Sequence, residues 1–186
     1  MRKIIYAQLV SLDGYIEDSD GNINWTKPGE ELHRHFNELE RNLGINFYGR
    51  KTSEAMDFWL TADQQPDLKD YELEYARLWQ ETQRIVFSKT LDEVKGKADL
   101  KREVDPVEIR SLKNRNGKDM AVGGADLAST FIKNGLVDEF RLYIHPVAIG
   151  GGKPMFPLNE SLDLEFVESE TFSGGVVMLK YHAFNQ

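Results

Sequence analysis

The stretch Met120–Gly135, MAVGGADLASTFIKNG, decides the fold. It begins with a short apolar run, turns at Gly123-Gly124, and continues with Leu127 and Phe131 at helical spacing. Asn134-Gly135 then supplies a typical helix stop. A strand that passes into a helix through a glycine turn is the basic unit of an α/β protein, so this stretch predicts that fold class.

The rest of the chain repeats this alternation of strands and helices. Apolar residues recur at helical spacing from Leu32 to Leu43, which predicts one amphipathic helix, and Tyr71–Gln83 predicts another. Strands that alternate with helices imply a largely parallel sheet that is covered on both faces. The predicted strands are Ile4–Val10, Ile45–Tyr48, Arg84–Phe87, Met120–Val122, Phe140–Ile144, Leu164–Val167 and Val176–Phe184.

The C-terminal part has a different pattern. From Phe140 to Phe184 we expect strand, loop, strand, turn and strand, with Ser173-Gly174-Gly175 as a hairpin turn. These strands are therefore expected to be antiparallel. The polar segment 96–119 is expected to hold one short strand, one helix and a loop. The sequence thus predicts one domain over residues 1–186, with a central mixed, mostly parallel sheet flanked by helices.

Composition excludes several classes of protein. The chain has 186 residues, no cysteine, a formal net charge of −8 and a pI near 5.1. Without cysteine there is no disulfide framework and no thiol nucleophile. The acidic balance argues against a nucleic-acid partner, and no apolar run approaches the ~20 residues that span a bilayer. The N-terminal apolar stretch reads as a strand rather than a signal peptide, so we expect a cytoplasmic protein without a membrane or metal partner.

The segment Phe47–Thr52 has the composition of a phosphate site. A strand ends, Gly49 turns the chain, Arg50 and Lys51 follow, and a helix is expected to begin at Thr52. Glycine lets the backbone approach a ligand closely, and an arginine can donate two hydrogen bonds to phosphate oxygens. A plain strand-to-helix turn with solvated cations is the alternative interpretation.

A second candidate phosphate site lies in Val122–Ala128. Gly123 and Gly124 leave no side chain in the way of a pyrophosphate, and the helix that follows starts with Ala125 and continues through Leu127. The GxGxxG fingerprint of dinucleotide-binding sheets is absent. The alternative interpretation is tight packing of the strand against the helix.

Ser88-Lys89 forms a third, weaker candidate, because a hydroxyl and a cation follow the apolar run before them. Taken alone, this pair is better explained as a solvated loop. In an open parallel sheet, ligands bind outside the carboxyl ends of the strands, and all three candidates lie at such ends. One ligand with several phosphates would explain the repetition. A phosphorylated dinucleotide fits, and Arg50 with Lys89 favours the form that carries an extra ribose phosphate.

Candidates for proton transfer are few. Asp13 lies at the end of the first strand, and Glu31 lies in the first turn of the helix that follows. Asp13 is equally well explained as a turn-forming residue before Gly14. Glu31 is better explained as an exposed helix-start carboxylate that the helix dipole favours. Trp25 and Trp59 could line an aromatic pocket for a flat ring, or could simply be core.

An ordered set of motifs resembles the dihydrofolate reductase-like family, and more closely the stand-alone relatives of the reductase domain of the riboflavin-biosynthesis deaminase-reductase. The resemblance covers nearly the whole chain. The motifs are Ser11-Leu12-Asp13-Gly14, Gly21-Asn22-Ile23-Asn24-Trp25, Gly49-Arg50-Lys51-Thr52, Phe87-Ser88-Lys89, Gly123-Gly124, and Tyr143-Ile144-His145-Pro146 through Phe156-Pro157.

The resemblance implies a dihydrofolate reductase-like fold, NADPH as cofactor, and hydride transfer to a C=N bond or sugar carbonyl of a heterocyclic substrate. It implies that the Gly49 and Gly123 turns hold the pyrophosphate, and that backbone groups of Leu9 and Ile16 meet the nicotinamide amide. It further implies a cis bond between Gly123 and Gly124, and a homodimer formed through the C-terminal strands.

The substrate half departs from both named enzymes. Dihydrofolate reductases carry an acid on the first helix where this chain has Leu32 or His33, and the riboflavin reductases tend to have an acid where this chain has Val122. We therefore predict an NADPH-dependent reductase of a pterin- or aminopyrimidine-type substrate. The alternatives are a non-catalytic nucleotide-binding or regulatory module with the same fold, or a true dihydrofolate reductase.

Overall fold

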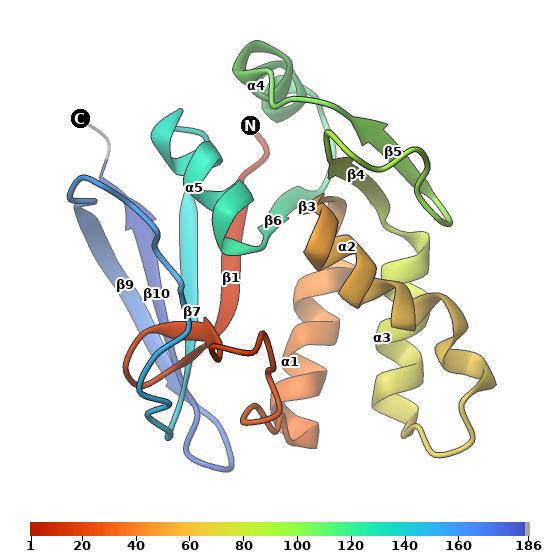
Figure 1. Ribbon diagram of the computed structural model, residues 1–186, viewed down its shortest axis with the longest axis vertical. Helices are drawn as coiled ribbons and strands as arrows, with labels where there is room; N and C mark the ends of the chain where they lie inside the picture. Colours follow the sequence, from red (N-terminus) through yellow and green to blue (C-terminus); the bar gives the residue numbers. More distant parts are fainter. Residues whose placement is uncertain (185–186) are drawn as a thin grey trace.

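The computed structural model describes residues 1–184, and Figure 1 shows a central sheet with helices on both of its faces. No helix within this range is long and apolar enough to cross a membrane. The elements in chain order are β1 (Ile4–Ser11), β2 (Tyr15–Glu17), α1 (Glu30–Arg41), β3 (Leu43–Gly49), α2 (Arg50–Met56), the 3-10 helix η1 (Asp57–Gln64), α3 (Asp70–Glu81), β4 (Gln83–Phe87), β5 (Ala98–Lys101), α4 (Pro106–Asn114), β6 (Asp119–Gly123), α5 (Ala125–Lys133), β7 (Glu139–His145), β8 (Lys153–Pro154), β9 (Leu164–Thr171) and β10 (Val177–Ala183).

The main sheet has eight strands in the order β5-β4-β3-β6-β1-β7-β10-β9. The neighbours from β5 to β7 pair in parallel, whereas β10 pairs antiparallel with both β7 and β9. The prediction of a mostly parallel sheet that ends in antiparallel C-terminal strands is confirmed. Because β1, β3, β4 and β6 are parallel, their carboxyl ends lie along one edge of the sheet, where a ligand site is expected.

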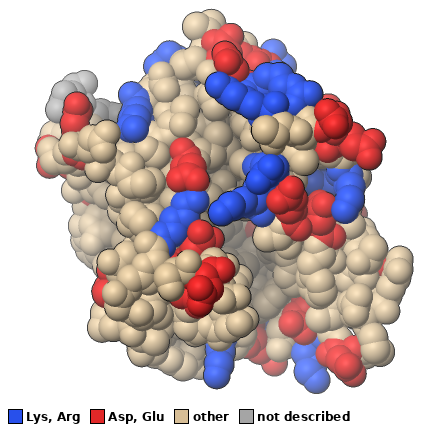
Figure 2. Space-filling model, in the orientation of Figure 1, with Lys and Arg blue, Asp and Glu red and all other residues tan. Residues whose placement is uncertain are grey.

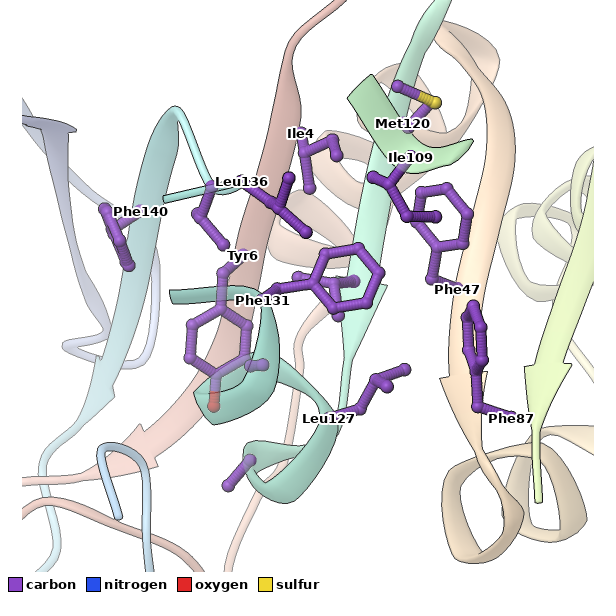
Figure 3. Packing of buried hydrophobic residues seen from close by; sticks show 14 of the residues in the cluster. Ile4, Tyr6, Phe47, Phe87, Ile109, Met120, Leu127, Phe131, Leu136 and Phe140 are labelled. Atoms are coloured by element: carbon purple, nitrogen blue, oxygen red, sulfur yellow. The ribbon is translucent and has the colours of Figure 1, made fainter. Parts of the chain in front are cut away.

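The larger core lies between one face of the sheet and helices α4 and α5. Phe131 of α5 is fully buried and packs against Phe47 of β3, with ring centroids 5.2 Å apart. Figure 3 shows Phe131 surrounded by strand side chains, with Ile109 of α4 above it. The helical spacing that predicted α5 therefore describes its buried face.

Helices α1 and α3 cover the opposite face. Successive residues of a strand point to opposite faces, so Tyr48 points away from α5 when Phe47 points toward it. Tyr48 accepts a hydrogen bond from Trp79 of α3 at 3.1 Å. Leu32 of α1 is buried in a second cluster that includes Tyr143 of β7. The two layers of helices leave the carboxyl edge of the parallel strands open to the loops.

A separate two-stranded ribbon links two distant parts of the chain. β2 and β8 pair antiparallel, with Glu17 opposite Lys153. Gly152 has φ +137°, and a Cβ there would overlap the carbonyl oxygen of Glu17. Only glycine allows this close approach. The sequence did not predict either strand, because neither is long enough to show a period.

Several predicted boundaries were wrong by one or two residues. α2 begins at Arg50 rather than at Thr52, so both Arg50 and Lys51 lie in its first turn. Leu43 opens β3 instead of closing α1, and Gln83 opens β4 instead of closing α3. At Leu43 and Gln83 a helix runs into a strand within one or two residues, so hydrophobicity alone does not mark the junction.

The two strands of the C-terminal hairpin differ in exposure. β10 lies inside the sheet, and its Met178 is buried against the cluster under α1. The edge strand is β9, on which Phe166 is 57% exposed and Val167 39% exposed. Apolar side chains available to a partner are therefore on β9 rather than on β10.

Candidate nucleotide and substrate site

The two predicted phosphate turns meet in one cavity of about 380 Å³ at the carboxyl edge of the sheet. The turn between β3 and α2 forms one wall, and the turn between β6 and α5 forms the other. The predicted residues that line it are Gly49, Arg50, Lys51, Thr52, Gly123, Gly124, Ala125 and Leu127. The lining residues that the sequence did not single out are Phe87, Asp126, Thr130 and Lys153.

Direct packing brings these two turns together. Gly124 has φ +88°, and a Cβ on it would clash with Oγ1 of Thr52. A Cβ on Gly123 would lie 2.9 Å from the ring of Tyr48. The Gly123-Gly124 pair thus allows one turn to pack closely against the other. This role resembles the alternative interpretation, in which the glycines serve tight packing rather than ligand binding. The expected cis bond between them is wrong, since residues 1–184 contain only trans peptide bonds.

The cavity walls offer donors for an anion. Gly124 is the N-cap of α5 and provides no side-chain hydrogen bond to the first turn, so the N–H groups of that turn face outward without a capping side chain. Arg50, Lys51 and Lys153 add positive charge, and Asp126 adds one negative charge. Figure 2 shows basic and acidic side chains interspersed over this face of the molecule. The cavity has the chemistry of a site for a small polyanion.

Ser88 and Lys89 lie outside the cavity lining. The hydroxyl of Ser88 accepts hydrogen bonds from the backbone N–H groups of Thr90 and Leu91, at 3.2 and 3.1 Å, and so shapes its own turn. Lys89 lies 3.8 Å from Glu103. Thr90, which follows this pair, contacts the turn between β3 and α2. Its hydroxyl lies 3.3 Å from Nη1 of Arg50. The segment therefore borders the cavity at Arg50.

Leu9 and Ile16, the predicted contacts of the nicotinamide, also lie outside this lining. The side chain of Ile16 is in the core, and that of Leu9 packs against the cluster under α1. The predicted contacts involve the backbone, however. The pairing of β1 with β6 ends at Tyr6 opposite Val122, while β1 continues to Ser11. The end of β1 therefore extends past the β6–α5 turn, and the role of Leu9 and Ile16 stays a prediction.

Asp13 has the contacts of a loop anchor. Its carboxylate accepts hydrogen bonds from the hydroxyl of Ser11 at 2.7 Å and from the backbone N–H groups of Ile149 and Gly150 at 3.1 and 2.7 Å. The hydrogen bond from Ser11, assisted by those from Gly150 and Ile149, lowers the pKa of Asp13 below its ordinary value of 3.8. A group that is ionised at neutral pH is poorly suited to donate a proton.

Glu31 is held in a similar way. It accepts a hydrogen bond from the backbone N–H of Ser173 at 2.7 Å, which ties the start of α1 to the β9–β10 hairpin. That hydrogen bond lowers the pKa of the Glu31 carboxyl. Neither carboxylate lines the cavity. The geometry therefore favours the structural alternatives for Asp13 and Glu31 over their predicted catalytic roles.

Two buried polar atoms near the end of β1 have no hydrogen-bond partner. These are Nε1 of Trp25 and Nε2 of His145, whose rings lie 5.6 Å apart. His145 is 4% exposed and stands opposite Ser11 in the β1–β7 pair. Burial lowers the pKa of His145, and Nδ1 donates to the carbonyl of Tyr143, so Nε2 is left as an acceptor. One donor and one acceptor are thus left without a hydrogen-bond partner inside the protein.

The sheet order and the cavity at its carboxyl edge define a dihydrofolate reductase-like domain. Residues 2–178 match the family described as RibD C-terminal domain, and the chain belongs to this family of NADPH-dependent reductases. It is 37% identical to the uncharacterized protein YyaP of Bacillus subtilis (strain 168) over 97% of this chain and 95% of that protein. It is 27% identical to YwjB of the same organism over 97% of each chain.

Solved structures agree on the fold. A putative riboflavin biosynthesis protein from Shewanella sp. PV-4 aligns with a TM-score of 0.74 and 24% identity over the whole of both chains. RibD of Acinetobacter baumannii aligns with a TM-score of 0.68 and 16% identity over 99% of this chain and 58% of that one. These likenesses confirm the predicted fold, and the family match over residues 2–178 confirms the predicted family.

The contact between Gly124 and Thr52 yields a prediction about stability. Gly124→Ala adds both a strained positive φ and a steric clash, so we expect it to cost about 2–4 kcal/mol of unfolding free energy. Gly135→Ala is the matched control, because Gly135 has φ +61° and open space around its Cβ position; it should cost only the strain, about 1–2 kcal/mol. In a Thr52→Ala background the cost of Gly124→Ala should fall toward that of the control. Urea denaturation measures all four variants, and an unchanged cost in that background would contradict the contact.

The anchoring of Asp13 yields a prediction about pH. Because its folded pKa is lowered, its contribution is present above the unfolded pKa and is lost as the pH falls through the folded pKa. The N–H groups of Ile149 and Gly150 should keep their protection from hydrogen exchange as the pH falls from 7 to the ordinary pKa of an aspartate, and lose it only at lower pH, where the carboxyl of the folded protein becomes protonated. Asp13→Asn should weaken this protection at neutral pH. NMR exchange rates measure both effects, and full protection in Asp13→Asn would rule out the anchor.

Proposed function

We propose that this protein is an NADPH-dependent reductase of a pterin- or aminopyrimidine-type heterocycle, similar in reaction to 5-amino-6-(5-phosphoribosylamino)uracil reductase. The observation that carries the proposal is the single cavity into which both glycine turns open, with cations on its walls. A diaminohydroxyphosphoribosylaminopyrimidine deaminase/5-amino-6-(5-phosphoribosylamino)uracil reductase from Thermotoga maritima aligns with this chain at a TM-score of 0.68 and 17% identity, over 98% of this chain and 57% of that one.

The residues of the cavity suit a dinucleotide. The glycine turns leave room for a pyrophosphate, and the uncapped first turn of α5 offers it N–H donors. Arg50, beside Thr90, would meet the phosphate on the adenosine ribose and so would select NADPH over NADH. When bound, the cofactor supplies a hydride to a C=N bond or a sugar carbonyl.

The substrate would lie beside the end of β1. There Trp25 presents an N–H donor and His145 an acceptor, both in a water-poor setting. A pterin or aminopyrimidine ring carries donors and acceptors on neighbouring positions of its edge, so it can satisfy both groups. Buried polar groups that stay unpaired are costly, which gives such a ring an advantage over an apolar ligand.

A non-catalytic nucleotide-binding module is the second candidate. It is favoured by the carboxylates Asp13 and Glu31, which are both tied into loops with lowered pKa values. Such a module would keep the cavity and bind NADPH without turning over a substrate. A true dihydrofolate reductase is less well supported, because Leu32 stands near the position of the helix acid and is 1% exposed.

Titration with NADPH and NADH tests the proposal. NADPH should raise the melting temperature and change the cofactor fluorescence, and pterins or aminouracils should then accelerate NADPH oxidation.

Arg50→Ala should weaken NADPH binding by about tenfold or more and NADH binding much less, because a charge-assisted hydrogen bond contributes about 1.5–3 kcal/mol. Arg77→Ala on the exposed side of α3 is the matched control. Equal losses for both cofactors would contradict the assigned phosphate contact, and binding without any turnover would favour the second candidate.

We also propose a homodimer formed through the C-terminal strands, with β9 as the contact strand. Phe166 and Val167 would be covered in the dimer, which would remove apolar surface from water. Light scattering should give twice the monomer mass, and Phe166→Lys should shift the mass toward the monomer. A monomer mass for the wild-type protein at all concentrations would reject the dimer.

A further inference from the structure

Two residues that line the cavity formed by the glycine turns make an ion pair with each other. Nζ of Lys153 donates to Oδ2 of Asp126 at 2.6 Å, and both residues line the cavity. Asp126 lies in the first turn of α5, directly after the Gly123-Gly124 turn. Lys153 comes from β8, which is far away in the sequence. The pair therefore connects the wall that carries the N–H donors to the β2–β8 ribbon.

Asp126 is an unusual neighbour for a phosphate site. Its carboxylate is 78% exposed and adds negative charge at the N-terminus of α5, where an anionic ligand would bind. Left unpaired, it would repel that ligand. The pairing with Lys153 neutralises it, so the cavity keeps the excess positive charge that Arg50 and Lys51 supply.

Lys153 is held in place before any ligand binds. Its side chain is only 23% exposed, so its stem is packed while its ammonium reaches the cavity. Its backbone is fixed opposite Glu17, and Gly152 beside it lies so close to β2 that a Cβ would be 2.9 Å from Cα of Asp18. A side chain that is already held in place loses less conformational entropy when it binds a ligand.

The ion pair between Lys153 and Asp126 is weak enough for Lys153 to exchange Asp126 for another anionic partner. An ion pair with one highly exposed member contributes little, because water and salt screen it. A phosphate carries more charge than a carboxylate and accepts stronger charge-assisted hydrogen bonds. A phosphate oxygen that enters the cavity can therefore take the ammonium of Lys153 from Asp126.

We propose that Lys153 is a phosphate-binding residue of this cavity, that Asp126 holds its ammonium while the cavity is empty, and that the pyrophosphate of the dinucleotide replaces Asp126 as its partner. This inference rests on the proposed function and adds to it a third cation, brought by β8. The contact is to the pyrophosphate, which NADPH and NADH share, and so it differs from the contact assigned to Arg50.

Calorimetric titration of single variants tests the exchange. Lys153→Gln should weaken NADPH and NADH by the same factor, about tenfold, as expected for the loss of one charge-assisted hydrogen bond. Asp126→Asn should tighten both cofactors by about two- to fivefold, since it removes the competitor for Lys153 and the repulsive charge. Lys133→Gln is the matched control, because Lys133 is exposed at the far end of α5 and should leave both affinities unchanged. Thermal melts establish that each variant is folded.

The outcomes separate this inference from the proposed function. Unchanged cofactor affinities in Lys153→Gln, together with a loss in Arg50→Ala, would overturn the role of Lys153 and leave the reductase proposal standing. Weaker binding in Asp126→Asn would overturn the exchange of partners. If the wild-type protein binds neither cofactor, the proposed function fails, and titration with inorganic pyrophosphate then tests the role of Lys153. A lower affinity for pyrophosphate in Lys153→Gln than in the wild type would support that role, and an unchanged affinity would overturn it.

Discussion

The whole site depends on the approach of two turns that lie more than seventy positions apart in the sequence. Thr52, in the first helical turn after β3, packs against Gly124 at the start of α5 so closely that Gly124 has no room for a Cβ. The parallel order β3-β6-β1 brings the turns to one edge of the sheet. The strand order brings the turns to the same edge, and this contact sets how closely the cations of one turn lie to the N–H donors of the other.

The sequence predicted the architecture well, because the sheet is built from apolar runs bounded by glycine turns. α5 shows this clearly, since its helical spacing, its start at Gly123-Gly124 and its stop at Asn134-Gly135 all agree with the structure. The boundaries failed where a helix runs directly into a strand, as at Leu43. β2 and β8 were missed because strands of two or three residues carry no period and form only through tertiary pairing.

Whether a predicted site residue reaches the cavity depends on the contacts that hold it in place. The glycines and cations of the Gly49 and Gly123 turns share one cavity, because the topology fixes where strand ends go, whereas Lys89 lies outside its lining. Polar side chains were harder to assign, since Asp13 and Glu31 each find backbone N–H partners in loops that the sequence does not place near them. Ser88 instead accepts from the N–H groups of its own turn. Lys153 was missed for the same reason: it follows three glycines, far along the chain, and reaches the cavity only through the pairing of β8 with β2.

The walls of the cavity come mostly from the middle of the chain, between Gly49 and Thr130, whereas Trp25, His145 and the β9–β10 hairpin come from its two ends. This division has an evolutionary consequence. Under the proposed function, substitutions in the terminal segments would change which ring is accepted while the central segments keep the dinucleotide, so one scaffold would diversify its chemistry and retain its reductant. The same division makes the terminal loops the natural region to randomise when a new substrate is sought for this scaffold.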